Sequence, residues 1–184
     1  MNLFKPQASA IIKNRPHVVY LLVDCSTSMA GDALDQARQG ALSFAADARL
    51  RGYSVGLIRF ADTANALLNP DTGFTLAIAD LTAFGNTNLT AAIQLATERL
   101  ATEASGQRTM CIVTDGMPDN PRSALKAAKL ATHANIQIMA IGTSGADLKF
   151  LSKLATTSQL ANYVATAQLG QGLTEMAKML PRPR

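Results

Sequence analysis

The feature that most constrains the fold is an apolar run that ends abruptly in oxygen-bearing side chains. Residues 17–23 read His-Val-Val-Tyr-Leu-Leu-Val, and Asp24, Ser26 and Ser28 follow at alternate positions. The run is too short to span a membrane, and a continuous stretch of Val and Leu is typical of a strand buried on both faces. Such strands occur in parallel sheets that are covered by helices. We therefore expect an α/β protein that contains this strand.

The polar residues after this strand have two interpretations. In open α/β sheets, ligands bind where the carboxyl ends of strands meet the N-termini of helices. Three oxygen-bearing side chains at alternate positions of such a loop can converge on one point, and hard cations such as Mg²⁺ prefer oxygen ligands in an octahedral arrangement. The alternative is that Asp24 and the two serines only cap the helical pattern that begins near Asp32.

Two further stretches favour the metal interpretation. Residues 84–89 form a polar turn before a helical pattern, and they contain Gly85-Asn86-Thr87. Residues 108–116 read as a second buried strand that closes on Thr114-Asp115-Gly116. A D-x-S-x-S motif, a G-x-T loop and an apolar strand ending in T-D-G, in this order, resemble the von Willebrand factor A (VWA) domain family. The resemblance extends from about residue 15 to residue 180.

The resemblance implies a metal-ion-dependent adhesion site (MIDAS) that holds Mg²⁺ or Mn²⁺. In the family the two serines bind the metal directly, the threonine binds directly or through water, and the two carboxylates act largely through water. A metal held by neutral oxygens keeps much of its charge, so an Asp or Glu of another protein is its natural additional ligand. The metal-binding positions carried over to this chain are Asp24, Ser26, Ser28, Thr87 and Asp115.

Two loop positions depart from the commonest family pattern, although the ligand positions are intact. Thr27 stands where the family often has Gly, and its bulk bears on the geometry of the first loop. Asn86 also stands where Gly is frequent, and Asn tolerates a left-handed backbone better than most residues.

Strand and helix patterns alternate along the chain, which predicts a parallel sheet with helices on both faces. The short strand expected at 64–68 is a candidate antiparallel edge, and Asn120 with Pro121 predicts a helix start. The resemblance implies a Rossmann-like, doubly wound, mostly parallel six-stranded sheet in the order 3-2-1-4-5-6, with a topological switch point between the first strand and the strand that ends in Asp115. The expected strands are residues 17–23, 54–60, 64–68, 108–115, 136–141 and 160–165.

Length and cysteine content predict one intracellular domain. The 184 residues suit a single core, with 1–15 as an N-terminal tail and 16–184 as the VWA domain. The first residues contain no apolar signal segment, and no run reaches membrane-spanning length. At ~3.3 Å per strand residue, Cys25 and Cys111 are expected over ~10 Å apart, beyond the ~7 Å limit for a disulfide. Two free thiols indicate a reducing, cytoplasmic compartment.

These features favour a protein-binding module over an enzyme. The leading hypothesis is a cytoplasmic bacterial adaptor, similar to VWA proteins of tellurium-resistance-type stress systems or to those that work beside MoxR-type ATPases. The alternative is a metal-dependent hydrolase or phosphatase at the same site, but the chain has only His17 and His133 as candidate imidazole bases, and neither is placed beside the site by the sequence. The net charge of +4 is too modest to indicate nucleic-acid binding, and no membrane contact is expected.

One basic helix face has two interpretations. Helical spacing places four basic residues on the same side of the helix that follows Asp115. The face is either simply solvated or a flank that steers an acidic partner toward the metal. Its members are Arg122, Lys126, Lys129 and His133.

Overall fold

The computed structural model describes residues 17–70, 73–103 and 106–182, so the tail predicted for 1–15 lies outside the described residues. The strands form one six-stranded sheet in the order β3-β2-β1-β4-β5-β6. β3 is antiparallel to β2, and the other neighbouring strands are parallel. This confirms the predicted fold class, strand order and antiparallel edge. The strands are β1 His17–Asp24, β2 Tyr53–Phe60, β3 Ala64–Leu68, β4 Arg108–Thr114, β5 Gln137–Thr143 and β6 Ala161–Val164.

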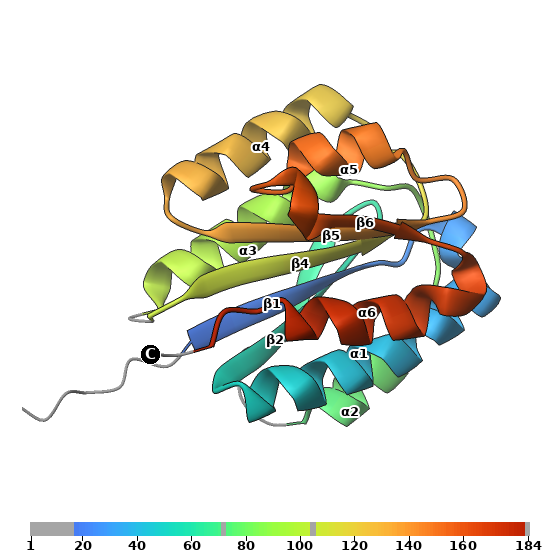
Figure 1. The fold of residues 1–184 in the computed structure, drawn as a ribbon. Helices are drawn as coiled ribbons and strands as arrows, with labels where there is room; N and C mark the ends of the chain where they lie inside the picture. The colour runs from blue at the N-terminus through green and yellow to red at the C-terminus, as the bar shows by residue number, and fades with distance from the viewer. Residues whose placement is uncertain (1–16, 71–72, 104–105, 183–184) are drawn as a thin grey trace, which may run out of the picture.

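Helices cover both faces of the sheet. The helices are α1 Asp32–Leu50, α2 Phe74–Ala79, α3 Leu89–Thr102, α4 Pro121–His133, α5 Leu148–Leu154 and α6 Leu169–Lys178. Figure 1 shows α1, α2 and α6 on one face and α3, α4 and α5 on the other. Within the described ranges, none of these helices has the length and apolar character needed to cross a membrane.

β1 supplies side chains to both hydrophobic layers, which explains why its sequence is continuously apolar. Val19 and Leu21 pack into the layer under α1 and α6, whereas Tyr20 and Leu22 pack into the layer under α3 and α4. All four side chains are at most 1% exposed. The apolar stripe of α1 is also buried, and it consists of Leu34, Ala37, Ala41, Phe44 and Ala48.

The direction of the strands brings the predicted site residues to one edge of the sheet. β1 pairs with β2 on one side and with β4 on the other, so the chain reverses its winding direction at the seam between β1 and β4. Asp24 is the last residue of β1, and Thr114 is the last residue of β4. Because both strands are parallel, their polar carboxyl ends lie side by side at the switch point, where ligands bind in open α/β sheets.

Candidate metal centre

Asp24 is a fully buried carboxylate whose two oxygens are both held in place. Its exposed fraction is 0%. Oδ1 accepts a hydrogen bond of 2.8 Å from the backbone N–H of Ser26, and Oδ2 accepts one of 2.6 Å from the hydroxyl of Thr114. Burial raises the pKa of Asp24 above its ordinary value, while the hydrogen bonds from Thr114 and Ser26 act in the opposite direction. The geometry therefore presents a carboxylate of fixed orientation.

A chain of hydroxyl groups crosses the switch point from the β1 loop to Asp115. The side-chain oxygens of Ser26 and Ser28 lie 3.0 Å apart within hydrogen-bonding geometry. Ser28 Oγ donates a hydrogen bond of 2.8 Å to Oδ1 of Asp115, which follows β4 directly. Ser26 and Asp115 are buried, whereas Ser28 is exposed. The structure thus brings these three oxygen-bearing side chains together from two loops.

Thr87 lies on the neighbouring loop and is fixed there through its backbone. Its N–H donates to Oδ1 of Asp119 at 3.1 Å, and its carbonyl accepts from the N–H of Asp119 at 3.0 Å. The loop is joined to the first one because Thr27 donates from its N–H and its hydroxyl to the carbonyl of Gly85, at 3.1 and 3.0 Å. In the part of the chain that the structure describes, Thr87 makes no hydrogen bond to the other four predicted ligands.

The two unusual loop positions are both accommodated, one of them in an unexpected way. Thr27 is exposed, and its hydroxyl links the two loops. The left-handed residue of the second loop is Gly85, with φ 63°, and not Asn86. Asn86 instead donates to Oδ1 of Asp62 from its backbone N–H at 3.0 Å and from its side-chain amide at 2.8 Å. Asn86 therefore does not adopt the left-handed backbone conformation that its residue type tolerates.

Three positioning residues were missed by reasoning from the sequence. Thr114 orients Asp24, Asp119 holds the backbone of Thr87, and Asp62 holds the second loop. Thr114 stands in the T-D-G motif, and Asp119 directly precedes the predicted helix start at Asn120. Neither position indicates its partner, because Asp24 and Thr87 lie 90 and 32 residues away along the chain.

The donor set fits a hard divalent cation. It consists of two carboxylates and three hydroxyls, with no nitrogen or sulfur, and oxygen ligands of this kind suit Mg²⁺ or Mn²⁺. Across residues 17–70, 73–103 and 106–182, neither Asp24 nor Asp115 forms an ion pair with a basic side chain. The same ranges contain no cluster of three His, Cys, Asp or Glu side chains that would suggest a different metal site.

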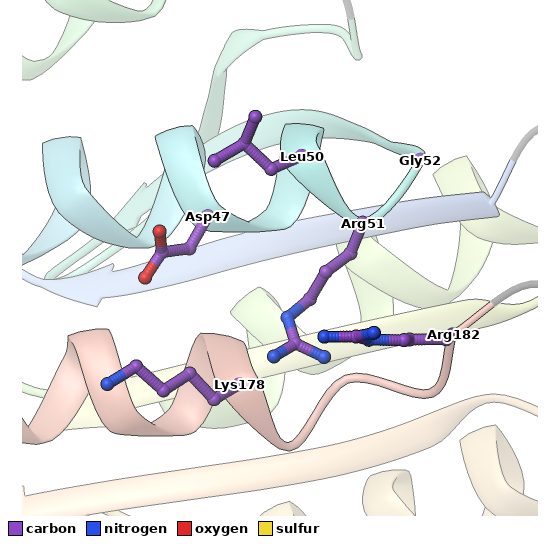
Figure 2. Close-up of a pocket in the computed structure, with 6 residues that line it drawn as sticks. All are labelled: Asp47, Leu50, Arg51, Gly52, Lys178 and Arg182. Carbon is purple, nitrogen blue, oxygen red and sulfur yellow. The ribbon is translucent and has the colours of Figure 1, made fainter.

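A separate hollow of about 620 Å³ lies at the opposite edge of the sheet, near the C-terminal ends of α1 and α6. Figure 2 shows the basic side chains of Arg51, Lys178 and Arg182 around it, together with Asp47. Cations at the C-terminus of a helix interact favourably with the unpaired carbonyls there. Arg51 does so directly, since Nη1 donates to the carbonyl of Leu180 at 3.4 Å. This hollow is remote from Asp24. Its cationic side chains are explained by their favourable interaction with the C-terminal ends of α1 and α6.

The sheet order and the oxygen-rich loops at its switch point define a Rossmann-like α/β domain of the VWA type. The family model of the von Willebrand factor type A domain matches residues 19–178, and the chain belongs to this family. A UPF0353 protein of Mycobacterium tuberculosis is 31% identical over 156 residues. That alignment covers 71% of this chain but 45% of the mycobacterial protein, so the chain matches less than half the length of this relative.

Solved structures of low sequence identity share the fold. The vWF domain of the type V pili tip protein Mfa5 from Porphyromonas gingivalis superposes with a TM-score of 0.80 at 13% identity, over 91% of this chain and 95% of that one. The mussel-byssus proximal thread matrix protein 1 with a zinc-occupied MIDAS motif has a TM-score of 0.72 at 17% identity, over 92% of this chain and 47% of that one. VWA domains are typically protein-interaction or adhesion modules that bind a divalent metal at the MIDAS.

Proposed function

We propose that this chain is a metal-dependent protein-binding module in which a partner's Asp or Glu docks at a MIDAS metal. The observation that carries the proposal is the hydrogen-bonded chain from Ser26 through Ser28 to Asp115, which gathers oxygens from two loops at the switch point. The residues that would hold Mg²⁺ or Mn²⁺ are Asp24, Ser26, Ser28, Thr87 and Asp115.

The chemistry of these ligands explains why a partner would be acidic. When bound, the metal supplies a positive charge and an open coordination position. Neutral hydroxyl ligands leave much of that charge uncompensated, so an external carboxylate is attracted more strongly than a neutral group. Thr114 keeps the carboxylate of Asp24 in one orientation, and Asp119 keeps the loop of Thr87 in place. Such supporting contacts preorganise a metal site.

The positions of the histidines argue against a hydrolase at the same site. His17 is the first residue of β1, and His133 is the last residue of α4. Both lie at the edge opposite Asp24, because α4 runs back toward the start of β4, where Arg108 Nη2 donates to the carbonyl of Ala134 at 2.8 Å. A general base must lie within hydrogen-bond reach of the proton that it abstracts. Asp24 and Asp115 could act as bases in principle, but this proposal assigns both to the metal, so we propose binding without catalysis.

The proposed setting is a bacterial cytoplasm, in a tellurium-resistance-like stress system or beside a MoxR-type ATPase. The mycobacterial relatives support a bacterial origin of this domain type. Cys25 and Cys111 are both buried free thiols, which supports a reducing compartment.

Calorimetry with a purified partner tests the proposal. A partner captured in Mg²⁺ is titrated into the protein with Mg²⁺ and again with EDTA, and binding is expected only with the metal. Asp115→Ala, Thr87→Ala and an Asp→Asn or Glu→Gln change in the partner should each weaken binding by ~2 kcal/mol or more. Equal affinity in EDTA would show that the partner docks elsewhere.

A further inference from the structure

The two helices packed against β5 and β6 carry basic side chains and no acidic ones. Between them, α4 and α5 contain no Asp or Glu, and their lysine and arginine side chains are all exposed. Figure 1 shows the two helices side by side on the face of the sheet opposite α1 and α6. We call their exposed side the α4–α5 face, and its basic residues are Arg122, Lys126, Lys129, Lys149 and Lys153.

Helix stability explains only part of this arrangement. Arg122 and Lys126 are four residues apart, as are Lys149 and Lys153, and like charges at this spacing destabilise a helix. Arg122 also lies in the first turn of α4, where the helix dipole disfavours a cation. Lys178 on α6 shows the contrasting arrangement, since it forms a 2.7 Å ion pair with Glu175. Lys153 lies in the last turn of α5, where the helix dipole favours a cation, so helix stability accounts for Lys153 but not for Arg122, Lys126 or Lys149.

The face is hollowed rather than flat. One hollow, of about 190 Å³, lies between α4 and α5, and Lys129, His133 and Lys153 contribute to its lining. A second, more open hollow of about 610 Å³ lies over α5 and is lined by Asp147, Leu148, Lys149, Ser152 and Lys153. Lys153 lines both hollows, so they are neighbours, and we call the two together the α4–α5 groove. Leu148 is 49% exposed and adds an apolar contact to this groove.

We propose that the α4–α5 groove docks an acidic segment of a partner protein, with carboxylates at Lys149 and Lys153 and an apolar side chain against Leu148. Charge complementarity carries the choice of partner, since α4 and α5 offer five cations, and the one carboxylate that lines the two hollows, Asp147, caps α5 by accepting from the N–H of Lys149. A concave groove with one apolar contact suits a peptide chain better than a flat bilayer. Single-stranded nucleic acid is disfavoured because Phe150 of α5 is buried and offers no stacking surface.

This groove is distinct from the proposed metal centre. Its inner hollow lies near His133, at the C-terminal end of α4, whereas Asp119 and Asp115 precede the N-terminal end of the same helix, and neither hollow is lined by any of the five predicted metal ligands. The inference therefore goes beyond the proposed function, and it is tested under conditions in which the metal centre does not contribute.

Fluorescence anisotropy in EDTA and at low salt provides the test. The probe is a labelled helical peptide with glutamates along one side and leucines beside them, and the same peptide with glutamine in place of glutamate is the control. The double variant Lys149→Gln/Lys153→Gln should bind the acidic peptide about fivefold more weakly, since two exposed ion pairs are lost. Leu148→Ala should also weaken binding. Lys178→Gln and Leu76→Ala are the matched controls, because both residues lie on helices of the opposite face.

Several outcomes would overturn the proposal. One is equal affinity of the wild type and the groove variants for the acidic peptide. Another is binding of the peptide only with Mg²⁺, which would assign its recognition to the metal centre and leave the proposed function standing. A third is tighter binding of the wild type to phosphatidylserine vesicles or to a DNA duplex than to the peptide, with this tighter binding lost in the double variant. Peptide binding in EDTA that depends on Lys149 and Lys153 would support the proposal even if the metal centre failed its own test.

Discussion

Thr114 donates a hydrogen bond of 2.6 Å to Oδ2 of Asp24 across the seam between β4 and β1. Each residue is the last of its strand, and Thr114 is only 1% exposed. Through this contact, a residue of β4 orients the carboxylate at the end of β1. A side chain that orients a ligand affects metal affinity even though it does not touch the metal.

Replacing Thr114 by valine should therefore weaken Mg²⁺ binding by about tenfold, because the nearly isosteric side chain lacks the hydroxyl that orients Asp24. Calorimetric titration with Mg²⁺ measures the effect. Thr109→Val is the matched control, since Thr109 is a buried threonine of the same strand whose hydroxyl contacts Gln137 at 3.5 Å. Equal losses in both variants would mean that the effect comes from the strand and not from Asp24.

Divalent metal should raise the thermal stability of the wild-type protein. A ligand that binds only the native state adds ~2.7 kcal/mol at a concentration of 100 times its Kd. Asp24→Ala and Ser26→Ala should abolish the rise in Tm with Mg²⁺ or Mn²⁺, as measured by differential scanning calorimetry. Asp80→Ala is the control, because Asp80 is exposed at the end of α2. A metal response that survives in both site variants would place the metal elsewhere.

Elements with strong local signals were predictable from the sequence. The composition of residues 17–23 predicted a strand buried on both faces, and β1 has that burial. Asn120 and Pro121 predicted the start of α4, and the side chain of Asn120 accepts from the N–H of Ser123 at 3.0 Å. In both cases the physical cause lies within a few neighbouring residues, so the pattern alone is sufficient.

The contacts that support the site were not predictable in the same way. Asp62 and Asn86 are 24 residues apart, and Thr114 and Asp24 are 90 residues apart. These pairs meet only because the sheet has a particular register and the loops have a particular path. The role expected for Asn86 failed for the same reason, since Gly85 takes the positive φ and leaves the Asn86 amide free to bind Asp62.

The purified protein should show no turnover of phosphate monoesters, carboxyl esters or nucleotides with Mg²⁺ or Mn²⁺. The physical reason is that neither His17 nor His133 lies at the edge that carries Asp24. Colorimetric assays at high enzyme concentration make the measurement, with Ser28→Ala as the background. Metal-dependent turnover that disappears in Ser28→Ala would favour the hydrolase hypothesis.

Both cysteines should be unreactive toward thiol reagents in the native protein. Burial, with a further contribution from Asp24, raises the pKa of Cys25 to about 12, and burial also raises the pKa of Cys111. A raised thiol pKa lowers the fraction of thiolate at neutral pH, and thiolate is the nucleophile. Colorimetric thiol titration should detect no rapid reaction without denaturant and two thiols in denaturant. Rapid labelling of the native protein would contradict the burial of these side chains.

Gly85 should be replaceable only at a cost to both stability and metal affinity. It has φ 63°, and a Cβ built on it would lie 2.0 Å from Oδ2 of Asp62. Gly85→Ala should therefore displace Asp62, which accepts the two hydrogen bonds from Asn86, and the loop that carries Thr87 should lose its support. Gly73→Ala is the matched control, because Gly73 has φ 87° and a Cβ there meets nothing within 4 Å.

The comparison separates backbone strain from the collision with Asp62. Gly73→Ala should lower the free energy of unfolding by about 1–2 kcal/mol, the cost of a left-handed conformation with a Cβ. Gly85→Ala should lower it further, because the displaced Asp62 also leaves the polar groups of Asn86 without their acceptor. Urea denaturation measures the stability difference, and calorimetry with Mg²⁺ should show a loss of affinity in Gly85→Ala alone. Equal stability costs and unchanged Mg²⁺ affinity in the two variants would show that Asp62 does not hold the metal-site loop.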